Sequence, residues 1–389
     1  MNGFMKYSKH NKSSFFCYPE LIALKKSEIS GLKELGVIYN NNNNTNFVKQ
    51  IQWSPDGMCL LSSSNDNILR SFIISDSILE KNEISELPCS SFIRSAEPVY
   101  SYVWYPKMKL NDLNSCCFLV SVRDHPIHLY DALTSTLRAS YPLIDHCERF
   151  LAPNSLIFSL DGARFIAGTN NMLSIYALHM YGDGPIATFH TTPTRHSKSS
   201  LFHPIQKGII SSLSLNTLGV LAAGTFSSTV GIYSNEGCGD IVSVFNVGDG
   251  GVTQVLWIND YKLLVVSRKS EKMSIWDIRT LSCIKTLGPR FAMTQQRMTV
   301  DIWDNYIIAG SMDGIVRIWK DDILLFEWNA HHDVVSSVVV HPLYPLVATC
   351  SGSRKYDEKY FDKYDNDSDN DMKCISRNYD NSIKLWNLL

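Results

Sequence analysis

The sequence repeats one short pattern seven times, and each copy ends in an aromatic residue. The residue three positions before the aromatic is always apolar, and the residue two positions before the aromatic is polar or small. This alternation with a period of two is typical of a strand that buries one face. The seven copies end at Phe72, Tyr130, Tyr176, Tyr233, Trp276, Trp319 and Trp386.

A turn and two further strands precede each of these segments. Runs such as "FVKQIQW" (47–53) and "CLLSSS" (59–64) read as strands, and a fourth strand follows most of the aromatics. Six residues before the aromatic, a short polar residue is expected to close a tight turn by bonding nearby backbone groups. In four copies it is aspartate: Asp66, Asp124, Asp313 and Asp380.

Four strands in a unit of about 40–45 residues are typical of a WD40 propeller blade. The aromatics lie 43 to 67 residues apart, with the longer gaps read as loop insertions. We therefore predict an all-β, seven-bladed WD40 β-propeller over residues 47–389. The last copy lacks an outer strand, and an uncovered edge invites aggregation. We expect residues 1–46 to supply a closing strand and an Asn-rich linker, with 14–24 favoured over 35–40 as the strand.

Composition excludes several classes of protein. Lys and Arg total 36 against 38 Asp and Glu, so no strong net field favours a DNA-coating protein. The ten cysteines include no CxxC pair, which argues against a zinc ribbon. The first residues hold no apolar core typical of a signal peptide, and no run reaches the ~20 apolar residues of a membrane helix. We expect a nuclear or cytosolic protein.

Two His-containing stretches resemble metal or acid–base sites. His125 and His128 lie close to Asp124, and "AHHDVV" (330–335) holds His331 and His332. The strand alternation favours a structural role for His128, and a histidine before the first strand of a WD repeat commonly bonds the turn aspartate. Without a phosphate loop or a paired nucleophile and base, we expect no enzyme activity, no cofactor and no metal.

Basic residues gather near turns that should share one rim of the propeller. A ring of such residues could hold RNA phosphates or bases, the alternative being ordinary surface charge. The candidate RNA- or partner-binding residues are Arg123, His125, Arg268, Lys269, Arg297 and Arg354. The insertion at 353–378 is acidic, with seven acids against two lysines over 357–371, and reads as a solvated loop or a docking loop for a basic partner.

Some stretches resemble one family more closely than they resemble generic WD repeats. "RDHPIHLYDA" (123–132) and "ATCSGSR" (348–354), in this order, are similar to the telomerase Cajal body protein family. The Asn tract at 40–44 departs from the animal members, and the chain looks more like the fungal, splicing-associated branch.

The resemblance implies a nuclear, non-enzymatic scaffold of small nuclear ribonucleoproteins that acts in pre-mRNA splicing, by stabilising the U1 particle on the 5′ splice site. The alternative is a factor that binds small Cajal body RNA or telomerase RNA. The implied partners are RNA, small nuclear ribonucleoprotein proteins and spliceosome components, around a monomeric propeller. A protein-only adaptor that binds peptides at the channel is a further alternative.

Overall fold

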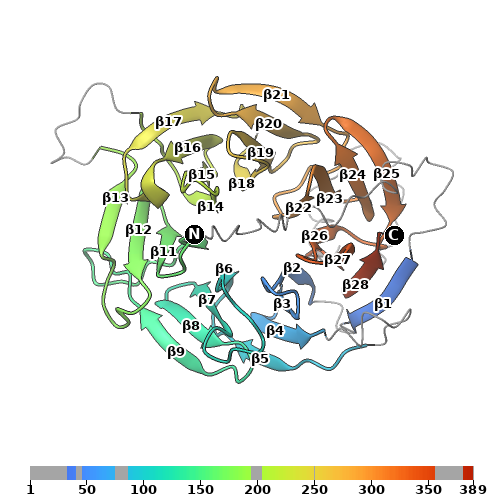
Figure 1. Ribbon diagram of the computed structural model, residues 1–389, viewed down its shortest axis with the longest axis horizontal. Coiled ribbons are helices and arrows are strands. Elements are labelled where there is room, and N and C mark those ends of the chain that lie inside the picture. The colour runs from blue at the N-terminus through green and yellow to red at the C-terminus, as the bar shows by residue number, and fades with distance from the viewer. Residues whose placement is uncertain are drawn as a thin grey trace, which may run out of the picture.

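The chain forms a ring of seven four-stranded antiparallel sheets around a central channel (Figure 1). The computed structural model describes residues 33–40, 46–74, 86–193, 204–248, 250–354 and 380–388. The predicted all-β propeller with seven blades is therefore confirmed. Among the described residues, no helix has both the length and the apolar character needed to cross a membrane.

In six blades the strands follow one another in chain order from the innermost to the outermost, and in the last blade β1 (Lys33–Asn40) takes the outermost place. The innermost strands are β2 (Val48–Trp53), β6 (Val99–Trp104), β10 (Ser155–Phe158), β14 (Ile210–Leu215), β18 (Val252–Trp257), β22 (Val300–Trp303) and β26 (Val335–Val340). The second strands are β3 (Cys59–Ser64), β7 (Cys117–Val122), β11 (Arg164–Gly168), β15 (Leu221–Thr225), β19 (Lys262–Ser267), β23 (Tyr306–Gly310) and β27 (Leu346–Ser351).

The third strands carry the repeated aromatics. They are β4 (Ile68–Ile73), β8 (Ile127–Asp131), β12 (Met172–Ala177), β16 (Thr229–Tyr233), β20 (Met273–Asp277), β24 (Ile315–Lys320) and β28 (Ser382–Asn387). Six blades have outer strands that follow in sequence, namely β5 (Ser91–Arg94), β9 (Leu137–Tyr141), β13 (Ala187–His190), β17 (Ile241–Asn246), β21 (Ser282–Leu287) and β25 (Ile323–Asn329). A short 3-10 helix, η2 (Asn235–Gly237), lies between β16 and β17.

The last blade is closed by a strand from the N-terminal part of the chain. β1 (Lys33–Asn40) pairs antiparallel with β28, and the two lie side by side in Figure 1. The preference for 14–24 as this strand was wrong, because 33–40 contains the second candidate and occupies the edge; residues 14–24 lie outside the described residues. β1 also contacts the neighbouring blade, since the ring of Tyr39 lies 5.7 Å from that of Phe72 in the first blade.

Neighbouring blades hold together through apolar side chains buried between them. Each adjacent pair shares a hydrophobic cluster, such as the one that joins β23 and β24 to β26 and β27. The second strands carry small residues where the next inner strand approaches. A Cβ at Gly310, for example, would lie 2.5 Å from Val335 Cγ1. Small residues are therefore needed for this packing.

The turn aspartate of the last blade belongs to a buried chain of hydrogen bonds. His331 Nδ1 lies 3.0 Å from Asp380 Oδ2, and His331 Nε2 lies 2.8 Å from Thr349 Oγ1. Trp386 Nε1 donates to the same threonine hydroxyl at 2.8 Å. These hydrogen bonds link the loop before β26 to β27 and β28 and so hold that end of the blade together. His331, rather than His332, thus takes the structural role expected for one of the two.

The turn aspartates of two other blades also bond the backbone. Asp66 accepts a hydrogen bond from the N–H of Ile68 at 3.1 Å, and Asp313 accepts one from Ile315 at 3.0 Å. Each is also paired with an arginine four residues later, at 2.6 and 2.7 Å. Such Asx turns start the third strands of these two blades with a defined geometry.

Asp124 occupies the equivalent turn but makes no such bond. The residue two positions later is Pro126, which has no backbone N–H. Asp124 instead has a φ of 55° and an exposed side chain that pairs with Arg123 at 3.3 Å. The expectation that this carboxylate bonds the turn backbone is thus wrong, because proline removes the donor.

Candidate functional site

Two sets of loops meet on one face of the propeller. The turns between second and third strands bond to the loops that lead into the innermost strands. The N–H of Arg123 donates to the carbonyl of Pro98 at 3.1 Å, and that of Arg268 to the carbonyl of Gly251 at 3.0 Å. The shared rim expected from the sequence is therefore present.

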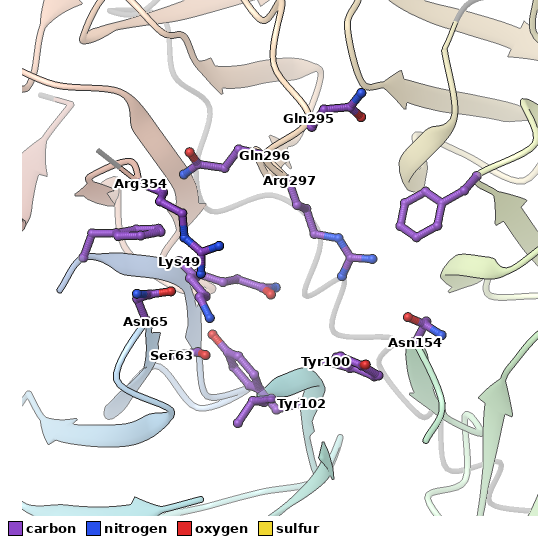
Figure 2. A pocket seen from close by; sticks show the side chains of 14 residues that line it. Lys49, Ser63, Asn65, Tyr100, Tyr102, Asn154, Gln295, Gln296, Arg297 and Arg354 are labelled. Carbon is purple, nitrogen blue, oxygen red and sulfur yellow. The ribbon is translucent and has the colours of Figure 1, made fainter. Parts of the chain in front are cut away.

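A cavity of about 490 Å³ opens at the centre of this rim, at the mouth of the channel (Figure 2). We refer to this cavity and its lining as the mouth. Its walls come from the first, second, third, fourth and seventh blades and from the loop between the fifth and sixth. The lining residues are Phe47, Lys49, Gln50, Ser63, Asn65, Val99, Tyr100, Tyr102, Asn154, Phe226, Gln295, Gln296, Arg297 and Arg354.

Three cations and no carboxylate line the mouth in the described part of the chain. Burial lowers the pKa of Lys49, and the neighbouring Arg354 lowers it further. Burial also lowers the pKa of Arg297, whose Nη2 donates to the carbonyl of Ser211 at 2.5 Å. Like charges held this close raise the local positive potential, because low-dielectric walls screen them less than water does. A mouth with this lining can therefore attract an anionic group.

Aromatic rings and side-chain amides complete the lining. The side chain of Tyr100 is 37% exposed, and Phe226 is half-buried with the guanidinium of Arg268 4.8 Å from its ring centre. Tyr102 is buried, and its hydroxyl donates to the carbonyl of Leu61 at 3.5 Å. The amide-bearing residues Asn65, Asn154, Gln295 and Gln296 also line this cavity. Flat rings and amides together can stack on and hydrogen-bond a planar, polar ligand.

β-bulges turn some of these side chains toward the mouth. Five innermost strands have a register shift around their second residue. In β2 this residue is Lys49, and in β6 it is Tyr100. A bulge re-aims the side chain of its extra residue. These two mouth residues were missed from the sequence, since alternation with a period of two does not reveal a bulge.

The loop between β21 and β22 delivers Gln295, Gln296 and Arg297 to the mouth. Its far end is fixed by Arg290, which donates from Nε to the carbonyl of Gly310 at 3.0 Å and from Nη2 to that of Met298 at 3.1 Å. Gln296 Nε2 donates to the carbonyl of Gly352 at 2.9 Å. Arg297 is thus presented from a braced loop.

Gly352 occupies a place that a larger residue could not. Its φ is 133°, and a Cβ there would lie 2.4 Å from the Cβ of Phe47. The glycine allows the turn after β27 to pass close to the entry of β2. Arg354, two residues later, therefore reaches the mouth.

The six candidate rim residues divide into two groups. Arg297 and Arg354 line the mouth, and Arg268 adjoins it through Phe226. The exposed Lys269 and the Arg123–His125 turn lie on the same rim but do not line the cavity. His125 Nδ1 lies 2.6 Å from the carbonyl oxygen of Arg123, within its own turn. The structure therefore brings together only part of the predicted set.

One cluster away from the mouth has metal-ligand chemistry. The side-chain ligand atoms of Asp145, His146 and Cys147 lie within 4.8 Å of one another at a hairpin tip. However, Asp145 accepts hydrogen bonds from the N–H groups of Cys147 and Arg149, and its other oxygen is paired with the Arg149 guanidinium at 3.1 Å. These bonds lower the pKa of Asp145 and occupy both of its oxygens. The cluster is a stabilised turn.

Comparison with known sequences agrees with the architecture. The model of the "WD domain, G-beta repeat" family matches residues 33–72 and 297–320. The first match begins with the closing strand β1, and the second begins at Arg297 in the mouth.

Relatives match over most of the chain. Guanine nucleotide-binding protein negative regulator 1 of Schizosaccharomyces pombe is 36% identical over 325 residues, 80% of this chain and 81% of that protein. Telomerase Cajal body protein 1 of Bos taurus is 28% identical over 362 residues, 88% of this chain. Protein SWT21 of Vanderwaltozyma polyspora is 25% identical over 342 residues, 82% of this chain and 76% of that protein.

The alignment with the bovine protein covers 65% of its length, and that with the human protein 58%. The resemblance thus extends through the propeller, and the fungal relatives are matched over more of their length. This chain belongs to the WD40-repeat family that includes telomerase Cajal body protein 1 and its fungal relatives.

Proposed function

We propose that this protein is a nuclear scaffold of small nuclear ribonucleoproteins that acts in pre-mRNA splicing, stabilising the U1 particle on the 5′ splice site, and that the mouth holds RNA. The observation that carries the RNA part is the mouth itself, where the described residues supply three cations and no carboxylate. The resemblance to the fungal branch supports the splicing part. No catalytic step is included in the proposal, because a scaffold acts by binding.

The chemistry of the mouth fits single-stranded RNA. Lys49, Arg297 and Arg354 can neutralise phosphates, Tyr100 and Phe226 offer faces on which a base can stack, and the amides can bond base edges. A cavity of about 490 Å³ is in the range of pockets for drug-sized ligands. It therefore suits one or two splayed nucleotides and is too small for a duplex. Arg268 and Lys269 would extend the path along the rim.

Charge reversal in the mouth tests this proposal. In the variant Lys49→Glu/Arg354→Glu, we expect affinity for a short single-stranded RNA to fall about tenfold or more, with a shallower salt dependence, because phosphate contacts are lost. Fluorescence anisotropy at several salt concentrations measures both. Lys107→Glu, an exposed change in the loop between β6 and β7, is the matched control and should change affinity less than twofold. Equal binding by all three proteins would exclude the mouth as the RNA site.

Two other functions have specific support. The name of the bovine relative connects that protein to telomerase and the Cajal body, which favours small Cajal body RNA or telomerase RNA as the ligand. The Schizosaccharomyces pombe relative is named as a negative regulator of a guanine nucleotide-binding protein, which favours a protein-only adaptor. Sequencing the RNAs that copurify with the chain distinguishes the first of these functions from a role in splicing. Partners that remain bound after RNase treatment would favour the second.

A further inference from the structure

Asn154 lines the mouth between two blades that supply aromatic rings. Tyr100 comes from the second blade and Phe226 from the fourth, and Asn154 comes from the third blade, directly before β10. Figure 2 shows Tyr100 and Asn154 across the cavity from Arg354. An amide therefore stands on the part of the wall that carries rings.

The backbone on either side of Asn154 is held by the neighbouring blades. Ser121 Oγ of the second blade donates to the carbonyl of Pro153 at 2.7 Å. Ser155 Oγ donates to the carbonyl of Ile210 of the fourth blade at 3.0 Å. Both bonds are buried, and both use the residues next to Asn154 rather than its own amide. Asn154 is thus held in place while its side chain lines the cavity, as a preorganised binding site requires.

The three cations of the mouth occupy two separate positions. Burial, and then the charge of the nearby Arg354, lowers the pKa of Lys49, so these two cations lie close together. Arg297 instead reaches the fourth blade, where its Nη2 donates to the carbonyl of Ser211 at 2.5 Å. A nucleotide within an RNA strand has a phosphate on each side of its sugar. One nucleotide can therefore place its phosphates near these two positions and its base against the wall that carries Asn154.

We propose that Asn154 reads adenine in the mouth, by bonding the edge of a base that stacks on Tyr100. This inference rests on the proposed binding of RNA there. The Asn154 amide offers a donor and an acceptor side by side. Adenine offers the complementary pair, an N–H and a ring nitrogen, on two of its edges, and asparagine is a common bidentate partner of this base. Asn154 is therefore a specificity-determining residue, whereas the cations supply affinity without selecting a base.

A carboxylate at the same position would select a different base. Both of its oxygens accept hydrogen bonds and neither donates, so its complement is an edge with two adjacent donors. Guanine presents such an edge through its N1–H and N2–H groups, whereas adenine does not. Asn154→Asp keeps the shape of the side chain and changes only this pattern and the charge. The substitution should therefore exchange the preferred base and not merely weaken binding.

Four short RNAs measure the preference without any variant of the protein. They are heptanucleotides of uridine in which the central base is uracil, adenine, guanine or cytosine. Fluorescence anisotropy gives the affinity of the full chain for each. We expect the RNA with central adenine to bind most tightly, about tenfold more tightly than the RNA with central guanine. Equal affinities, or a preference for another base, would overturn the reading of adenine. Failure of all four RNAs to bind would instead contradict the proposed function itself.

Asn154→Asp and its control Asn65→Asp make the same chemical change at two places in the mouth. In Asn154→Asp the RNA with central guanine should bind more tightly than the RNA with central adenine, which inverts the wild-type order. In Asn65→Asp the added charge should weaken all four RNAs by a similar factor and leave their order unchanged. If the order is unchanged in both variants, or changes equally in both, Asn154 does not read the base. The proposed RNA site would then still be judged by the charge reversal of Lys49 and Arg354.

Discussion

The seventh and second blades carry aspartate at the same position of the repeat and use it in different ways. Asp380 is 10% exposed at its side chain and lies against His331. Asp124 is 71% exposed, and its one ion pair among the described residues is with the neighbouring Arg123. The repeat therefore defines the position of the aspartate in the blade, and the neighbouring residues determine how much it contributes to stability.

The two blades differ at each member of the hydrogen-bond chain that begins at Asp380. In the seventh blade, His331 bonds the hydroxyl of Thr349 in β27. The strand registers place Val120 at the corresponding position of β7 in the second blade. The tryptophan that donates to Thr349 is replaced by Tyr130 in the second blade. A valine offers no hydroxyl, so the hydrogen-bond chain has no middle member there. The second blade relies instead on apolar packing of Val120 and Tyr130.

Removing each carboxylate in turn should give the largest difference in stability between the two blades. Asp380→Ala leaves His331 and three backbone or hydroxyl donors without their acceptor, and we expect a loss of about 3 kcal/mol in the free energy of unfolding. Asp124→Ala removes an exposed pair and should change it by less than about 0.5 kcal/mol. Urea unfolding of the two variants measures both. Similar losses would mean that the seventh-blade network is not a stabilising feature.

The pH dependence of stability should show the same contrast with a smaller amplitude. Burial opposes ionisation of Asp380, but the hydrogen bonds and charge of His331 and the donors around it hold its pKa well below its usual value. A carboxyl whose pKa is lower in the folded state stabilises above its unfolded pKa, about 3.9, and that stability is lost as pH falls below it.

The wild type should thus lose more stability than Asp380→Asn when pH falls from about 5 toward 3. Thermal midpoints of the two proteins over this range give the difference, and Asp124→Asn should follow the wild type. A constant gap between wild type and Asp380→Asn would place the effect of the substitution outside ionisation.

The propeller was predictable because its repeat is carried by residues that every blade needs. An apolar residue, an aromatic and a turn residue at fixed spacing suffice to place seven third strands. The closing strand was harder, because 14–24 and 35–40 are both apolar enough to form one. What decides between them is the pairing of β1 with β28 and the contact of Tyr39 with Phe72, which no local pattern encodes.

The mouth was predictable only in part. Arg297 and Arg354 were found because loops at that end of the blades converge on one rim. Lys49 and Tyr100 were missed because a bulge, not the alternation, turns them toward the mouth. The sequence does not distinguish the buried Arg290 from Arg297, seven residues away in the same loop. Their difference arises from the carbonyls of Gly310 and Met298, which fold back around Arg290.

The smallest effect is expected from restoring the backbone N–H that the second blade lacks at Pro126. Pro126→Ala gives residue 126 a backbone N–H, which can reach Asp124 as Ile68 reaches Asp66 and Ile315 reaches Asp313. The substitution itself changes the entropy of the unfolded chain, so its single effect is not informative. The useful quantity is the coupling between positions 124 and 126.

In a double-mutant cycle of Pro126→Ala and Asp124→Ala, we expect a coupling of about 0.5–1 kcal/mol, the usual net contribution of one hydrogen bond. The carboxylate should then contribute to stability in the alanine background and not in the proline background. Urea unfolding of the four proteins gives the coupling, and the Arg123 pair is the same in both backgrounds and cancels. A coupling near zero would mean that the positive φ of Asp124, rather than the missing N–H, keeps its carboxylate away from the backbone.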